Sequence, residues 1–194
     1  RSAGDLVATT GDISVSGNLE LVTLPSTAGD PPVDRLVSAH QGALDVDGNV
    51  STSGGGGLRI EALEVALGKT TDADPNDAIP PVTTGGAILT RGDLRIGFTD
   101  AGGVQQTQTV VTRSVDTRGA SGNEGGDVDI AASGNITLGQ ITTSGGAGGT
   151  SEPNRDGGSV SVRSTGAGTT VTVGAITTGG ADAAEQAGIE LRAD

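Results

Sequence analysis

A short block that occurs twice almost unchanged constrains the fold of this chain more than any other feature. Residues 136–146 read ITLGQITTSGG and residues 171–180 read VTVGAITTGG, at an offset of 35 residues. Self-similarity at a period of about 20–50 residues is typical of solenoids, propellers and other arrays of stacked units. The chain is therefore predicted to consist of repeated units that stack on one another.

Looser copies of this block occur upstream. Each has an aliphatic residue, then hydroxyl-bearing or acidic residues, then glycine, and the copies begin at Val50, Val82, Val115, Ile141 and Ile176. The spacings are 32, 33, 26 and 35 residues, which is more variable than a helical repeat would be. Variable length around a fixed strand core predicts stacked coils whose connecting loops accept insertions.

Short segments that alternate apolar and polar residues occur along the chain, and this period of two predicts β-strands with one buried face. They include residues 12–15, 19–21, 44–46, 58–60, 63–65, 94–96, 128–130, 136–138, 160–162, 171–173 and 189–191. One coil is interpreted as strands at 128–130, 136–138 and 141–143, followed by a Gly-rich loop. The predicted class is all-β: a parallel β-helix of about five or six coils of roughly 26–35 residues, with three short strands per coil. A sandwich of hairpins is the competing fold.

Glycine followed by Asp or Asn opens many of these strands, as in Gly92-Asp93 and Gly134-Asn135. Glycine tolerates the positive φ of a tight corner, and the short polar side chain can hydrogen-bond its own nearby backbone. We therefore expect these dipeptides to form the corners between the faces of a coil.

The composition favours a thin interior. The 194 residues include 35 Gly and one Phe, but no Trp, Tyr, Met or Cys, so Val, Ile, Leu and Ala must fill the core. We expect a single β-helix segment over residues 1–194, less regular over 1–41. Protruding loops are expected near 24–34, 72–81 and 147–158, where the prolines occur. Because the chain begins at Arg1 in the middle of a pattern, we expect it to be a piece of a longer protein.

The formal net charge of −13 argues against a nucleic-acid partner, since binding phosphates requires a basic patch. The absence of Cys excludes disulfides and thiol chemistry. No run of about 18 apolar residues is present, so membrane insertion is not expected.

The segments Gly134–Gly139 (GNITLG) and Ile141–Gly146 (ITTSGG) resemble the repeat region of large secreted bacterial proteins. These are the filamentous-haemagglutinin-like exoproteins of two-partner secretion and related autotransporter passengers. The resemblance covers residues 42–192 and implies a right-handed β-helix, an extracellular or cell-surface location, and adhesive or matrix roles. The Asn-Pro-Asn motifs of that family's secretion module are absent, so the resemblance places this chain in the shaft.

Calcium is the one cofactor that the sequence suggests, and its candidate ligands are Asp72, Asp74 and Asp77. These carboxylates have a spacing similar to that of calcium loops, and calcium prefers about six to eight oxygen ligands. Asp77, however, stands where a glycine is expected, and Thr83 occupies the place of the ring-closing Glu. An acidic proline-rich loop is the alternative interpretation. Asp45 and Asp47 have similar spacing but fit outward strand positions.

Catalysis is not expected. His40 is the only histidine and has no nucleophile or metal ligands at a meaningful spacing. Enzymes that cleave polysaccharides need paired carboxylates and usually aromatic rings, and only Phe98 supplies such a ring besides His40. The Thr pairs of the repeat, at 83/84, 142/143 and 177/178, are expected to form outward hydroxyl ladders, either as good β formers or as an ice-binding array.

The predicted function is a structural shaft segment of an extracellular bacterial adhesin or surface filament, which displays contact loops on a rigid rod. The expected partner is a surface protein or glycan of a host or neighbouring cell. A subunit that stacks end to end with copies of itself into a fibre or matrix is the first alternative. A polysaccharide-degrading β-helix enzyme and an ice-binding protein are the others.

Overall fold

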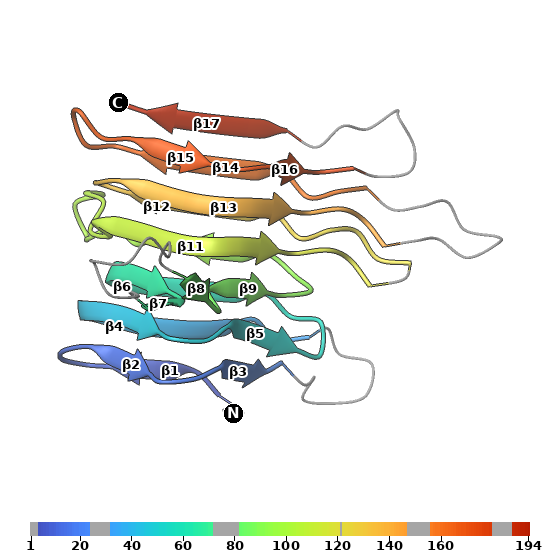
Figure 1. Cartoon of the computed structure of the whole chain (residues 1–194), viewed down its shortest axis with the longest axis horizontal. Helices are drawn as coiled ribbons and strands as arrows, with labels where there is room; N and C mark the ends of the chain where they lie inside the picture. The colour runs from blue at the N-terminus through green and yellow to red at the C-terminus, as the bar shows by residue number, and fades with distance from the viewer. Residues whose placement is uncertain (1–3, 24–31, 72–81, 121, 147–155, 180–187) are drawn as a thin grey trace.

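The computed structural model describes residues 4–23, 32–71, 82–120, 122–146, 156–179 and 188–194, and every regular element in these ranges is a β-strand. The strands lie one above another from the N-terminus to the C-terminus (Figure 1). Their bounds are β1 (Leu6–Ala8), β2 (Ile13–Val15), β3 (Leu19–Val22), β4 (Arg35–Val46), β5 (Val50–Ser53), β6 (Leu58–Leu67), β7 (Lys69–Thr71), β8 (Val82–Thr84), β9 (Ala87–Leu89), β10 (Leu94–Ile96), β11 (Thr109–Asp116), β12 (Val128–Ala132), β13 (Ile136–Thr142), β14 (Val160–Ser164), β15 (Val171–Val173), β16 (Ile176–Thr177) and β17 (Ile189–Ala193).

Parallel pairing organises fifteen of these strands into three ladders. The first ladder runs β1, β4, β6, β10, β12, β14, β17; the second runs β2, β4, β6, β11, β13, β15; the third runs β3, β5, β9, β11, β13, β16. The chain passes through the first, second and third ladder in turn, and we call each such passage a coil. The prediction of an all-β chain with parallel strands is confirmed.

Three separate strands per coil are found only in part of the chain. β4 and β6 continue through the corner from the first ladder into the second, and β4 has a register shift between Ala39 and Ala43. β11 and β13 likewise continue from the second ladder into the third. Extended backbone therefore turns some corners without leaving the strand conformation.

The register places aliphatic residues above one another in columns. The column of the first ladder is Leu6, Val37, Ile60, Ile96, Ile130, Val162 and Leu191. Those of the second and third ladders are Ile13, Leu44, Val65, Val110, Ile136, Val171 and Leu19, Val50, Ile88, Val115, Ile141, Ile176. The inner members are almost fully buried. Burial of one such side chain stabilises the fold by about 1.5–3 kcal/mol, so these columns form the core.

A fourth column consists of buried threonines at the end of the third ladder: Thr52, Thr90, Thr117 and Thr143. Thr117 Oγ1 donates a hydrogen bond to the Gly126 carbonyl at 2.6 Å, and Thr143 Oγ1 donates to the Gly158 carbonyl at 2.5 Å. The prediction that both residues of each Thr pair point outward is therefore wrong for Thr143. Alternation along the strand turns Thr142 outward and Thr143 inward, where its hydroxyl bonds a corner carbonyl.

The copy of the repeat that begins at Val82 does not belong to the stack. β8 pairs with β7 in an antiparallel hairpin, so Thr83 and Thr84 form no part of a parallel ladder. Ile88 takes the expected place, because it lies in register with Val50 on one side and Val115 on the other. The hairpin is therefore an insertion within one coil, between its second-ladder strand β6 and its third-ladder strand β9.

Asp and Asn at the corners bond the next coil, not their own nearby backbone as predicted. In each case the side-chain Oδ1 accepts a hydrogen bond, at 2.7–3.0 Å, from a backbone N–H that lies 23–38 residues later in the chain. The acceptors are Asp5, Asp12, Asn18, Asp34, Asn49, Asp93, Asp127 and Asn135. These side chains therefore hold neighbouring coils in register.

Replacement of Thr143 by valine tests the buried threonine column. We expect Thr143→Val to lower the free energy of unfolding by about 1–3 kcal/mol, because it leaves the buried Gly158 carbonyl without its hydroxyl donor. Thr142→Val is the matched control, since the same change at this half-buried neighbour should stay within about 0.5 kcal/mol. Urea unfolding of the three proteins measures both values, and equal losses would contradict the inward assignment of Thr143.

Candidate functional site

The outward side of the first ladder carries the densest group of charged side chains in the stack. Its central row, read from coil to coil, is Arg59, Arg95, Asp129, Ser161 and Glu190. The corresponding rows of the second and third ladders contain mostly Ser, Thr, Ala and aliphatic residues. The outward face of the first ladder is therefore the candidate site.

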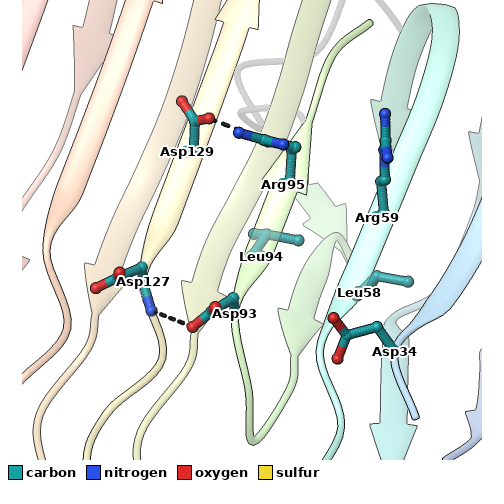
Figure 2. A pocket seen from close by; sticks show the side chains of 8 residues that line it. All are labelled: Asp34, Leu58, Arg59, Asp93, Leu94, Arg95, Asp127 and Asp129. Atoms are coloured by element: carbon teal, nitrogen blue, oxygen red, sulfur yellow. Dashed lines mark hydrogen bonds and ion pairs between the residues drawn. The ribbon is translucent and has the colours of Figure 1, made fainter.

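A groove of about 480 Å³ lies on this face, across neighbouring coils (Figure 2). Arg95 Nε donates to Asp129 Oδ2 at 3.2 Å, and Figure 2 shows the two side chains directed at each other. The residues that line the groove are Asp34, Leu58, Arg59, Asp93, Leu94, Arg95, Asp127 and Asp129. Acidic and basic groups therefore share one depression on this face.

The aspartates at the edge of this groove are primarily structural. Asp34 Oδ1 accepts from the Gly57 N–H at 2.7 Å, and Asp93 Oδ1 accepts from the Asp127 N–H at 2.9 Å. Asp127 Oδ1 in turn accepts from the Ser159 N–H at 2.7 Å. Each carboxylate thus bonds the backbone of the following coil.

A buried carboxylate lies beside the groove. Glu61 is only 7% exposed, and its two oxygens contact His40 Nε2 and Arg59 Nη2, both at 2.5 Å. The ring of Phe98 stacks on the His40 imidazole, with the ring centroids 4.4 Å apart. The only histidine and the only aromatic side chain of the protein are therefore in contact at one corner of the stack.

A short excursion of the chain, residues 97–106, brings Phe98 to this corner. Gly97 leaves the first ladder with φ of 118°, and its N–H still donates to the Ile60 carbonyl at 2.9 Å. Asp100 Oδ1 accepts from the N–H groups of Gly102 and Val104, which closes the turn. Gln105 Nε2 donates to the Ala131 carbonyl at 2.9 Å and so fastens the excursion to the next coil.

The sequence prediction missed this arrangement. His40 was expected to be an isolated residue, but the register sets Ser38 beside Glu61 and so brings His40 to the Glu61 carboxylate. Asp72, Asp74 and Asp77 lie outside the described residues, so the calcium site stays a prediction. Within the described ranges, no group of three or more His, Cys, Asp or Glu side chains could hold a metal ion.

Comparison with known proteins gives no relative: no family model, curated protein or solved structure matches this chain. The described part of the chain also contains no helix that is long and apolar enough to cross a membrane. The assignment of function therefore has to rest on the geometry described above.

A second charged group lies on the third ladder, where Arg118 contacts Asp116. Burial of Asp116 by itself raises the pKa of this carboxyl. Hydrogen bonds from the Arg118 side chain and backbone, together with the charges of Arg118 and Arg91, outweigh that effect and lower the pKa below its ordinary value of 3.8. The same contact raises the pKa of the Arg118 guanidinium. The pair stabilises the fold only while Asp116 is ionised.

The lowered pKa of Asp116 predicts a pH-dependent effect of Arg118→Gln. A carboxyl with a depressed pKa in the folded state stabilises the protein above its ordinary pKa of 3.8, and this stabilisation is lost as the pH falls through the folded-state pKa. We expect a loss of about 0.5 kcal/mol at neutral pH, since the guanidinium is exposed. Below both pKa values the variant and the wild type should unfold at the same urea concentration; a constant difference at all pH values would contradict the prediction.

Two substitutions of Asp127 separate its hydrogen bond from its charge. Asp127→Ala removes the acceptor of the Ser159 N–H and should lower the free energy of unfolding by about 0.5–1.5 kcal/mol. Asp127→Asn keeps an oxygen at that position and should retain most of the stability. Chemical unfolding measures both variants. If the Asn variant lost as much free energy of unfolding as the Ala variant, the negative charge of Asp127 would be the stabilising property. That result would contradict the proposed hydrogen bond to the next coil as the source of the stability.

Proposed function

We propose that this chain is a right-handed parallel β-helix and serves as a shaft segment of an extracellular adhesin or surface filament. The observation that carries the proposal is the unbroken register of the three ladders, each of which continues through successive coils with its aliphatic column. Parallel strands joined by crossover connections are right-handed in about 98% of cases, which supports the handedness. The resemblance of the repeat to filamentous-haemagglutinin-like proteins agrees with this architecture.

A structural role fits the way in which the charged groups are used. Asp93 and Asp127 bond the backbone of the next coil, and Arg95 pairs with Asp129. The Glu61 carboxylate contacts both His40 and Arg59. These contacts stiffen the stack, whereas catalysis would call for groups that are free to exchange protons or attack a substrate.

The first-ladder face supplies a contact surface for a partner. Its groove is open, and the excursion of residues 97–106 stands at one border of that face. Extended side surfaces of this kind are what stacked-repeat proteins use to bind other molecules. We propose that the partner is a surface protein or glycan of a host or neighbouring cell. It binds along the side of the rigid shaft.

Labelling of intact source cells tests the proposed location and role. An antibody raised against this segment should label unpermeabilised cells, and an external protease should remove that signal. An antibody against a cytoplasmic protein is the control and should label only permeabilised cells. A signal from this segment that appears only after permeabilisation would contradict a surface shaft.

A further inference from the structure

A second hollow on the first-ladder face is lined by more arginines than aspartates. We propose that it binds an anionic group, a carboxylate or a sulfate, that is carried by a polysaccharide. The hollow measures about 220 Å³ and lies between the first ladder and the excursion of residues 97–106. Its lining includes Arg59, Arg95, Arg163, Asp129 and Phe98.

The balance of charge distinguishes this hollow. Three arginines and one aspartate line it, although the whole chain has a net charge of −13 and only 11 Lys and Arg residues. A local cluster of positive charge in a concave surface attracts anions, even on an acidic protein, because nearby groups dominate the potential inside a depression. The hollow is therefore a place on this face that can attract an anion.

The three guanidinium groups retain hydrogen-bond donors for a ligand. A guanidinium has five N–H donors, and Arg95 uses its Nε to bond Asp129. Arg59 contacts Glu61 through Nη2. The Arg163 side chain makes no hydrogen bond or ion pair with the part of the chain that the structure describes. Planar guanidinium forks of this kind bind carboxylate and similar oxyanions through paired N–H groups.

The arrangement also has an electrostatic cost. Arg59 lies directly opposite Arg95 in the register of β6 and β10, and Arg163 lies opposite Arg192 in that of β14 and β17. Like charges at directly opposite positions are destabilising in a sheet. Asp129 and Glu61 offset part of this repulsion at the first pair, and a bound anion between the arginines would offset more.

The remaining features favour a polysaccharide as the carrier of the anion. Phe98 presents an aromatic ring that stacking on His40 holds in place, and such rings pack against the apolar faces of sugars. Thr99 and Gln105 add hydroxyl and amide groups that suit sugar hydroxyls. The hollow shares Arg59, Arg95 and Asp129 with the larger groove, so an extended chain could follow both along the stack. The inference rests on the proposed function for the location of the hollow on the outside of a shaft. The anion-binding chemistry of the hollow does not depend on that function.

Binding of defined glycans to the whole chain tests the proposal. The probes are a hyaluronate oligosaccharide, which carries carboxylates, dextran sulfate, which carries sulfates, and neutral dextran of similar length. We expect at least one acidic glycan to bind in isothermal titration calorimetry and neutral dextran not to bind. The affinity should fall as salt is raised. Arg95→Gln and Arg163→Gln should each weaken binding about tenfold, as the loss of a charge-assisted hydrogen bond predicts.

Arg113→Gln is the matched control, because it removes the same charge from an exposed position where β11 passes from the second ladder to the third. It should bind the acidic glycan within about twofold of the wild type. Three results would overturn the site: no binding of either acidic glycan, equal losses in all three variants, or equally tight binding of neutral dextran. Polyglutamate that bound as tightly as the glycans would overturn the polysaccharide class. If no acidic glycan binds, the surface-labelling test of the shaft is unaffected. If the antibody does not label intact cells, the glycan-binding test of the hollow is unaffected.

Discussion

The parallel pairing of each coil with the next is the interaction on which the whole structure depends. A single coil of this chain has too few aliphatic residues to bury a core, so its side chains leave water only when coils stack. The corner side chains reinforce that stacking, since Asp127 bonds the next coil and Thr143 bonds a corner carbonyl. The close approach also explains the glycine content: a Cβ on Gly126 would lie 2.2 Å from the Gly92 carbonyl oxygen.

Register then determines what the outside of the molecule looks like. Because pairing is in parallel, residues from successive coils form rows at a spacing of about 4.8 Å. Arg59, Arg95 and Asp129 are far apart in the sequence, yet they become neighbours on one face. A surface site in such a protein therefore arises from one residue of each of several coils, together with any insertion that stands beside the row. The excursion of residues 97–106 is that insertion here.

The sequence alone was sufficient to predict the strands that form the core, but it was insufficient to predict the site on the first ladder. Alternation identified the strands that contain Ile60, Ile96, Ile130, Val162 and Leu191, because a buried face imposes a period of two. It did not identify the segment that contains His40, where the alternation is irregular and β4 changes register. The loops between coils differ in length, so the sequence gives no means of deciding that Arg59 lies opposite Arg95, or that Ile88 and not Val82 continues the third ladder.

The three faces differ in what they can bind. On the second ladder, Val111 interrupts the row that ends in Thr137 and Thr172, so aligned hydroxyls extend over only two coils. On the third ladder, Asp116 precedes Thr142 and Thr177 in the same way. An ordered array of threonines needs longer rows than these. The first ladder instead combines arginines, a fixed aromatic ring and an open groove. That asymmetry is why the proposed binding role lies on the first-ladder face and not on the other two.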